Sequence, residues 1–324
     1  ENYMLDKFKK IDPDIKENFS LKEFTTFKIG GNCKYFSLVK DVKQLVELIK
    51  LARSNNVPIQ LIGGGSNILI SDNGFSGLVI KLQFNTLEIK DTNVEVSADI
   101  ELSDLINQTV NSGLISLAVM MGIPGTIGGA VRGNAGAMGG EMRDSVEKIE
   151  VYRNGEVFEL SNEECKLDYR DSVFKHEGGV ILRVHMKLDL AAPDAVLMQK
   201  AMEHLKYRNA SQPQGFSSSG CIFKNVEYEM KNVELLKKHF QEDSEIMVQF
   251  KKVGKISAGW LVEQAEMKGK QIGNAKVSET HGNFLVNVGG ATFSDVISLI
   301  EEVKEAVYTK FGIELEEEVS IIQC

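Results

Sequence analysis

The chain has 324 residues, of which 43% are hydrophobic and 26% charged, and it carries a formal net charge of −9. One hydrophobic core serves at most about 250 to 300 residues, so this length predicts two or three domains. The acidic balance argues against a nucleic-acid-binding protein, which needs an excess of Lys and Arg on one face, but it allows an anionic small-molecule ligand.

The cysteines and histidines do not predict a disulfide framework or a metal site. The four cysteines form no C-x-x-C pair, and the five histidines lack the H-x-x-x-H spacing of a helical metal site. No apolar run reaches the length of a membrane span, and the first residues, "ENYML", do not resemble a signal peptide. We therefore expect a soluble, cytoplasmic, metal-free monomer that binds neither nucleic acid nor membrane.

The first predicted unit is a small αβ region. Apolar residues recur at helical spacing from Val42 to Ile49, and Pro58 marks the end of this helix. Short apolar runs then predict strands at residues 59–62, 68–70 and 78–82.

The middle region is predicted to be rich in strands. Residues 85–99 predict a hairpin, and the helix that follows has Ser103 as its candidate N-cap and Gly113 at its end. Asn154-Gly155 is typical of a tight hairpin turn, and residues 178–190 predict a further strand.

A helix with Pro193 near its start leads into a third region. The last predicted helix has an apolar stripe that runs from Val296 to Val307. The remaining apolar residues alternate with glutamates, as in a half-buried strand, and they are Ile313, Leu315, Val319 and Ile321.

Two glycine-rich loops are the first candidates for a binding site. Residues 122–140 hold eight glycines in nineteen positions, interleaved with apolar residues such as Ile127 and Val131 that a solvated linker does not need. This pattern favours a buried ligand loop over a structural cluster of turns, and a diphosphate that accepts main-chain N–H bonds is the commonest ligand of such loops. Residues 63–67, "GGGSN", form a second loop, and two loops together favour a dinucleotide over a mononucleotide. The spacing of the glycines fits neither the Rossmann fingerprint nor a Walker A loop.

Six motifs along the chain resemble those of the FAD-dependent UDP-N-acetylenolpyruvoylglucosamine reductases. They are "GGGSNILISDNGFSGLVI" (63–80), "GIPGTIGGAVRGNAGAMGG" (122–140), "YRDSVFK" (169–175), "SSSGCIFKN" (217–225), "SAGWLVEQAEMKG" (257–269) and "HGNFLVN" (281–287). The third region is short, which is typical of the compact class that lacks an extra substrate-side loop.

The resemblance implies an α+β fold with a two-part FAD-binding module of the vanillyl-alcohol-oxidase/PCMH type and an α+β substrate-binding domain. The implied ranges are 16–84 and 85–204 for the two FAD-binding subdomains, 205–311 for the substrate-binding domain, and 312–324 for a C-terminal strand. It also implies that NADPH reduces FAD, and that reduced flavin then reduces the carboxyvinyl group of a UDP-sugar to give UDP-N-acetylmuramate for peptidoglycan synthesis.

Each candidate site residue takes its role from this resemblance. The residues expected to bind FAD are Gly63, Gly64, Gly65, Ser66, Asn67, Gly122, Pro124, Gly125, Thr126, Gly128, Gly129, Asn134 and Gly136. Those expected to bind the substrate are Tyr169, Arg208, Lys224, Asn225 and Gln264. Without the resemblance, Lys224 is equally well explained as a solvated charge at the end of a strand, and Gln264 as part of an amphipathic helix.

Three residues are expected to be catalytic. The resemblance places Arg170 and Glu318 beside the substrate carboxylate, where a guanidinium stays charged and binds carboxylates through two hydrogen bonds. From the pattern alone, Arg170 between two aspartates reads as a surface ion-pair partner, and Glu318 as part of a solvated glutamate face.

Cys221 is the third, and it stands where the family usually places a serine that donates a proton to the substrate carbanion. A single cysteine in a strand is more often an inert buried thiol. A thiol is nevertheless a stronger acid than an alkyl hydroxyl and is mostly protonated at neutral pH, so it suits the same role.

Two other functions stay open at this point. One is a flavoprotein oxidase or dehydrogenase that acts on an alcohol or a sugar lactone, and the other is a non-catalytic protein that binds a UDP-sugar or flavin. The first would share the glycine loops but lack the set of Arg170, Cys221 and Glu318.

Overall fold

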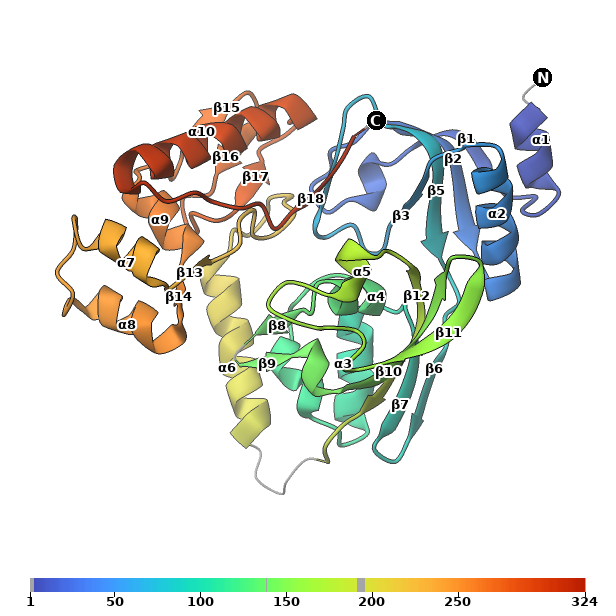
Figure 1. The fold of residues 1–324 in the computed structure, drawn as a ribbon, viewed down its shortest axis with the longest axis horizontal. Helices are drawn as coiled ribbons and strands as arrows, with labels where there is room; N and C mark the ends of the chain where they lie inside the picture. The colour runs from blue at the N-terminus through green and yellow to red at the C-terminus, as the bar shows by residue number, and fades with distance from the viewer. Residues whose placement is uncertain (1–2, 138, 191–195, 324) are drawn as a thin grey trace. The chain divides into compact units, whose positions relative to one another are not determined.

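The computed structural model in Figure 1 describes residues 3–137, 139–190 and 196–323. The chain divides into two compact units by its internal contacts. Unit 1 consists of Glu1–Ser20, Asn32–Gly65 and Phe75–Arg208, and unit 2 of Leu21–Gly31, Ser66–Gly74 and Asn209–Cys324. Two stretches of the range 16–84, which was expected to form one subdomain, thus belong to unit 2 by their contacts.

The first sheet of unit 1 has the strand order β1-β2-β5-β3. Its strands are β1 (Lys16–Ser20), β2 (Asn32–Val39), β3 (Ile59–Leu61) and β5 (Phe75–Leu82). Strand β5 lies parallel to β2 and β3, and β1 is antiparallel to β2. Helix α2 (Val42–Ser54) and the strand β3 after it form where they were predicted, whereas β2 before the helix was not predicted. The N-cap of α2 is Asp41, whose side chain accepts a hydrogen bond from the Gln44 N–H at 2.8 Å.

The second sheet of unit 1 is antiparallel, with the order β11-β10-β12-β7-β6 (Figure 1). Its strands are β6 (Leu87–Lys90), β7 (Asn93–Ser97), β10 (Val146–Arg153), β11 (Glu156–Ser161) and β12 (Val180–Lys187). The turn between β10 and β11 is the predicted one, since Asn154 and Gly155 both have positive φ, at 54° and 95°. The proposed division between residues 84 and 85 falls between the two sheets.

Helix α3 (Leu102–Asn111) forms where it was predicted, but its predicted N-cap is wrong. Glu101 occupies the N-cap position, and Ser103 lies inside the first turn. The reason is a distant contact: the Leu102 N–H donates to the Gly125 carbonyl at 2.8 Å, so the helix begins before Ser103. Gly113 has a φ of 79° just after the helix, as the sequence predicted.

The remaining helices and strands of unit 1 are short. They are α1 (Tyr3–Lys9), α4 (Ile127–Arg132), α5 (Val173–His176), β8 (Gly136–Ala137), β9 (Gly140–Glu141) and the 3-10 turns Ser116–Met120 and Met142–Asp144. A further 3-10 turn, Lys22–Phe24, belongs to unit 2. Helix α6 (Val196–Ser211) follows, and its last three residues belong to unit 2. Pro193, predicted near the start of this helix, lies outside the described residues.

Unit 2 consists of helices around small sheets (Figure 1). Its helices are α7 (Met230–Leu236), α8 (Glu245–Val253), α9 (Ala258–Gln264) and α10 (Phe293–Phe311). Its strands are β4 (Ile68–Ile70), β13 (Val226–Glu227), β14 (Lys255–Ile256), β15 (Gln271–Ile272), β16 (Ala275–Val277), β17 (Leu285–Asn287) and β18 (Ser320–Ile322). The predicted apolar stripe of α10, from Val296 to Val307, is buried in the core of this unit.

The C-terminal strand is shorter than predicted, and the prediction for Ile321 is wrong. Leu315 and Val319 are buried, but Ile321 is 36% exposed, whereas Ile322 is only 8% exposed. The alternation of buried and exposed residues stops because this part of the chain changes the segment with which it pairs. The Glu318 N–H donates to the Ile222 carbonyl, and residues 320–322 then pair in parallel with β4.

Among the described residues, no helix has the length and apolar character needed to cross a membrane.

Candidate active site

The two glycine loops that the sequence singled out lie against each other in unit 1. A Cβ on Gly63 would lie 2.5 Å from Thr126 Oγ1, and a Cβ on Gly64 would lie 2.9 Å from Gly125 Cα. Only glycine allows the main chains to approach this closely. The loops therefore form one continuous main-chain surface, although some sixty residues separate them in the sequence.

Thr126 and Gly128 fix the start of α4 within this surface. Thr126 Oγ1 accepts a hydrogen bond from the Gly129 N–H at 3.4 Å, and a Cβ on Gly128 would lie 2.9 Å from Ala98 Cβ. Closely packed glycines let a diphosphate approach the main chain, whose N–H groups are the donors that bind diphosphates in proteins. The N–H groups of Ile127, Gly128 and Gly129 already donate to Ile100, Ala98 and Thr126, so the donors would come from the rest of the two loops. The residues present thus fit the diphosphate of a dinucleotide such as FAD.

Lys81 lies beneath the first loop, and the sequence analysis missed it. Its ammonium donates a hydrogen bond to the Gly63 carbonyl at 2.6 Å. Burial lowers the pKa of Lys81, while the nearby carboxylates of Glu101 and Asp99 act in the opposite direction. A lysine in a buried strand that follows a glycine loop was the available signal.

Arg208, predicted to bind the substrate, lies on the second loop. Its Nη2 donates to the Gly122 carbonyl at 3.3 Å, and a Cβ on Gly122 would lie 2.7 Å from Leu205 Cδ1. Helix α6 therefore packs on the start of the loop that was predicted to bind FAD. Pro124 lies two residues after Gly122, and Gly136 lies farther along, in β8.

Tyr169 and Arg170 lie at the centre of a turn outside both sheets of unit 1. The main chains of Asp168 and Asp171 exchange two hydrogen bonds, at 3.1 and 3.0 Å, which close the turn. Arg170 has a φ of 53°, an unusual conformation for a residue other than glycine. Its guanidinium carbon lies 5.4 Å from the centre of the Tyr169 ring, and the Lys175 ammonium donates to the Arg170 carbonyl.

The carboxylate of Asp171, next to Arg170, is held in its ionised form. Partial burial raises its pKa, but hydrogen bonds from the His176 ring and the Ser172 N–H outweigh this effect, so the pKa lies below its ordinary value. His176 Nε2 lies 2.8 Å from the nearer oxygen.

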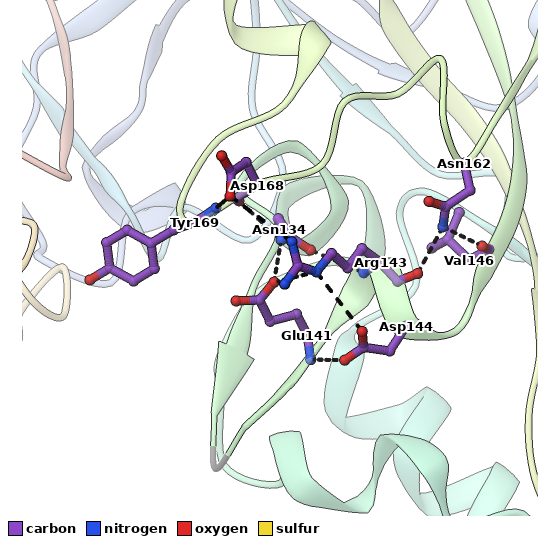
Figure 2. Close-up of polar contacts among 8 residues, drawn as sticks. All are labelled: Asn134, Glu141, Arg143, Asp144, Val146, Asn162, Asp168 and Tyr169. Carbon is purple, nitrogen blue, oxygen red and sulfur yellow. Dashed lines mark hydrogen bonds and ion pairs between the residues drawn. The ribbon is translucent and has the colours of Figure 1, made fainter. Parts of the chain in front are cut away.

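Asn134, predicted to bind the cofactor, is fully buried at 0% exposure in unit 1. Its side-chain Nδ2 lies 2.8 Å from Glu141 Oε2 and 3.0 Å from the Asp168 carbonyl oxygen. Its Oδ1 accepts a hydrogen bond from the Arg143 N–H at 3.0 Å (Figure 2). The amide therefore connects the glycine-rich segment to the turn that carries Arg170.

Cys221 and Glu318, both in unit 2, are brought together by main-chain hydrogen bonds. The Glu318 N–H donates to the Ile222 carbonyl at 2.7 Å, and the Ile222 N–H donates to the Asn283 carbonyl at 2.9 Å. Cys221 forms an isolated bridge with Phe284 and is half-buried. Glu318 thus bonds to the residue that follows the predicted proton donor, on a segment that pairs with the one carrying Cys221.

Asn67, from the first glycine loop, joins this arrangement in unit 2. Its side-chain Nδ2 donates to the Glu318 carbonyl at 3.2 Å, and its own carbonyl accepts from the Ser320 N–H at 3.0 Å. The Ser66 carbonyl lies 4.0 Å from where a Cβ would stand on Gly220, which has a φ of 80°. The end of the "GGGSN" loop thus contacts the segments that carry Cys221 and Glu318.

The three substrate-binding candidates of unit 2 all contact other residues of the chain. Lys224 forms an ion pair with Glu316, whose side chain is largely exposed. Asn225 Oδ1 accepts a hydrogen bond from the Ala258 N–H at 3.1 Å, at the start of α9. Gln264 is the last residue of α9 and is half-buried.

The predicted site residues divide between the two units. Unit 1 holds Tyr169, Arg170 and Arg208, and unit 2 holds Cys221, Glu318, Lys224, Asn225 and Gln264. That these two groups act on one substrate stays a prediction.

The other described cysteines differ from Cys221. Cys33 and Cys165 are buried, and burial raises the pKa of each thiol to about 11. Within residues 3–137, 139–190 and 196–323, no three or more His, Cys, Asp or Glu side chains form a group that could hold a metal ion.

Comparison with known proteins gives matches over nearly the whole chain. Residues 34–161 match the FAD binding domain model, and residues 212–322 match the model of the UDP-N-acetylenolpyruvoylglucosamine reductase C-terminal domain. The reductase of that name from Anoxybacillus flavithermus is 37% identical over 314 residues, which cover 95% of this chain and 94% of that protein. The one from Caldanaerobacter subterraneus is 34% identical and covers 98% of both chains. The crystal structure of the Thermus caldophilus enzyme superposes with a TM-score of 0.75 at 31% identity, over 96% of this chain and 98% of that one.

Proposed function

The chain belongs to the UDP-N-acetylenolpyruvoylglucosamine reductase family, and from this premise we propose how its residues carry out the reaction. It is an FAD-dependent oxidoreductase, a UDP-N-acetylmuramate dehydrogenase of peptidoglycan precursor synthesis. It reduces UDP-N-acetyl-3-O-(1-carboxyvinyl)-glucosamine to UDP-N-acetylmuramate with NADPH. The observation that best supports these roles is the hydrogen bond from the Glu318 N–H to the carbonyl of Ile222, the residue that follows Cys221.

Two additions to the carboxyvinyl double bond complete the reaction. FAD, when bound, supplies the hydride, which comes from NADPH. Hydride addition at the terminal carbon leaves negative charge on the neighbouring carbon and on the carboxylate. The protein must therefore stabilise this charge and deliver one proton to the carbon that carries it.

Arg170 stabilises the developing charge in this proposal. Its guanidinium stays protonated at any physiological pH and matches a carboxylate with two parallel hydrogen bonds. The left-handed backbone of Arg170 supports such a role, since residues in strained conformations cluster at functional sites.

Glu318 binds the other side of the substrate carboxylate. A carboxylic acid can donate a hydrogen bond to a carboxylate only when it is protonated, and burial beside another carboxylate favours that form. Glu317 and Glu318 are half-buried, whereas Glu314 and Glu316 before them are exposed, and the Glu317 carboxylate forms an ion pair with Lys304. These differences support a distinct role for Glu318 among the glutamates of the segment.

Cys221 donates the proton to the substrate carbanion. Its S–H bond breaks as the new C–H bond forms, and the thiolate then takes a proton from solvent. The half-buried position of Cys221 supports this role, because a donor must reach the substrate yet remain largely protonated at neutral pH.

The remaining candidates bind the nucleotide parts. Tyr169, Arg208, Lys224, Asn225 and Gln264 bind the UDP-sugar, and the exposed ion pair between Lys224 and Glu316 is weak enough for a substrate phosphate to replace the carboxylate. The main chains of the two glycine loops bind FAD, with Lys81 fixing the first loop through Gly63.

Residues 16–84 and 85–204 form the FAD-binding module, and 205–311 with 312–324 form the substrate-binding part. We also propose that the enzyme is a monomer. We propose that it is cytoplasmic because its nucleotide substrates are cytoplasmic.

Replacement of Cys221 tests the mechanism. In Cys221→Ala, we expect NADPH to reduce the flavin at the wild-type rate, while reoxidation by the carboxyvinyl UDP-sugar slows by about 10²- to 10⁴-fold, the usual contribution of a general acid. Stopped-flow absorbance at the flavin band measures both steps. Cys221→Ser is the matched variant and should keep most of the second step. A wild-type reoxidation rate in Cys221→Ala would show that the thiol is not the donor.

A further inference from the structure

The turn that carries Arg170 needs support from outside itself. Residues 168–171 belong to neither sheet of unit 1, and Arg170 has a φ of 53°. A residue in this region costs of order 1 kcal/mol or more and persists only where the surrounding structure holds it. Contacts made to the turn by distant parts of the chain therefore contribute, beside its own main-chain bonds and Lys175, to holding Arg170 in place.

Asn134 makes such a contact from 34 residues away. Its Nδ2 donates to the carbonyl of Asp168, the first residue of the turn, at 3.0 Å. The same nitrogen donates to Glu141 Oε2 at 2.8 Å, and Oδ1 accepts from the Arg143 N–H. Figure 2 shows the amide lying between the turn and the segment that holds Glu141 and Arg143.

These bonds use both N–H groups of the Asn134 amide. A side-chain amide has two N–H donors, and here one carboxylate and one carbonyl accept from them. The side chain is 0% exposed. No donor of this side chain is left to reach a bound dinucleotide, so its contribution must come through the residues that it holds.

Charged groups close the same network. Arg143 Nε lies 2.9 Å from Glu141 Oε2, and Asp144 Oδ2 accepts from the Glu141 N–H at 2.7 Å. Arg143 also lies 4.0 Å from the Asp168 carboxylate. Glu141 is thereby fixed as an acceptor, and it orients the amide of Asn134 so that the other N–H points to the turn (Figure 2).

We propose that Asn134 is a positioning residue for Arg170. It ties the segment after the second glycine loop to the turn that carries Tyr169 and Arg170, so that the guanidinium is held where the substrate carboxylate binds. This inference rests on the proposed role of Arg170, and it assigns to the Asn134 side chain a task other than direct cofactor binding.

The test is Asn134→Asp in the full-length, FAD-loaded enzyme. Aspartate has the same shape and tolerates the φ of 41° found here, but its carboxylate has no N–H to donate and repels Glu141. We expect flavin content and the rate of flavin reduction by NADPH to stay near wild type. Reoxidation by the carboxyvinyl UDP-sugar should slow by about 10- to 100-fold, the effect of a displacement near 1 Å.

Asn162→Asp is the matched control. Asn162 Nδ2 donates to the carbonyls of Arg143 at 2.7 Å and Val146 at 2.6 Å, in the same region but without contact to the turn (Figure 2). Like Asn134→Asp, this change removes two side-chain N–H donors. It should therefore lower stability while leaving the reoxidation rate near wild type. Hydrogen exchange at residues 168–171 should increase in Asn134→Asp alone.

A double-mutant cycle with Arg170→Lys separates a positioning role from a structural one. If Asn134 acts through Arg170, the two effects on reoxidation are less than additive. Additive effects, or a wild-type reoxidation rate in Asn134→Asp beside a slow Arg170→Lys, would overturn the inference and leave the proposed function standing. A wild-type rate in Arg170→Lys would instead remove the proposed role of Arg170.

Asn134→Gly is a second variant that tests the inference if Asn134→Asp does not fold. Glycine accepts the positive φ and removes the amide without adding a charge, so it should reproduce the slow reoxidation with normal flavin content. If both variants lose flavin while hydrogen exchange at residues 168–171 is unchanged, Asn134 serves the cofactor and not the turn, which contradicts the inference.

Discussion

The two units hold their candidate catalytic side chains in different ways. In unit 2, main-chain hydrogen bonds place Cys221 and Glu318, because the Glu318 N–H bonds directly to the carbonyl of Ile222. In unit 1, Arg170 lies on a turn, and the side chain of Asn134 makes a distant hydrogen bond to the main chain of that turn.

This difference predicts different sensitivities to mutation. Main-chain pairing depends little on the side chains present, as long as the register is kept. A side-chain network fails when one member is replaced, because its partners are buried and lose their hydrogen bonds together. Most changes near Cys221 should therefore leave its position intact, whereas one amide should decide the position of Arg170.

The largest effect on stability should come from replacing Asn283. In unit 2, where main-chain pairing otherwise holds the segments, this side chain bonds to main-chain groups. Its Oδ1 accepts from the Phe223 N–H and its Nδ2 donates to the Phe223 carbonyl, both at 2.8 Å and buried. Asn283→Ala leaves two buried main-chain groups without partners, so urea unfolding should show a loss of about 2 to 6 kcal/mol. Asn232→Ala removes an exposed amide bond to Glu227 and should cost less than about 0.5 kcal/mol. Equal losses would show that burial is not what makes Asn283 important.

A smaller effect should follow from a main-chain contact in unit 1. In Gly64→Ala the new Cβ meets Gly125 Cα at 2.9 Å, and strain of about 1 to 3 kcal/mol separates the loops. Because the separated loops no longer present their N–H groups together, FAD affinity should fall by about 5- to 150-fold in a fluorescence titration. Gly133→Ala is the control, since its Cβ would meet nothing closer than 3.6 Å. Normal FAD affinity in Gly64→Ala would mean that the contact between the loops does not matter for binding.

The smallest effect concerns the thiols and leaves the fold untouched. Because burial raises the pKa of Cys33 and Cys165 to about 11, far less thiolate is present there at pH 8 than in an ordinary cysteine. Half-buried Cys221 should therefore be alkylated by iodoacetamide well before either of them, as peptide mass spectrometry can show. Bound UDP-sugar should slow the reaction at Cys221 alone. Prior labelling of Cys33 or Cys165 would contradict the burial on which this contrast depends.

Features with local causes were predicted from the sequence. Helix α2 carries its own apolar spacing and capping aspartate, and Asn154-Gly155 can adopt the positive φ that its hairpin needs. The glycine loops were also identified, because few other sequences combine so many glycines with apolar residues.

Features with distant causes were missed or predicted wrongly. Ser103 is not the N-cap because a carbonyl of Gly125 bonds to the residue before it, and Ile321 is exposed because the chain changes partners between Val319 and Ile322. The network of Asn134 has the same origin, since its partner Asp168 lies in another part of the chain. No local sequence pattern indicates such a hydrogen bond between distant residues.

The parallel pairing of β18 with β4 has a consequence for the newly synthesised chain. Glu318 and Asn67, which bond beside this pair, are 251 residues apart. At about 5 to 20 residues per second, a ribosome adds Glu318 roughly 10 to 50 s after Asn67. Flavin-binding segments can therefore emerge and begin to fold while the carboxylate is still missing. A chain released before residue 318 would retain the glycine loops yet lack Glu318, so, if Glu318 has its proposed role, such a chain would be inactive.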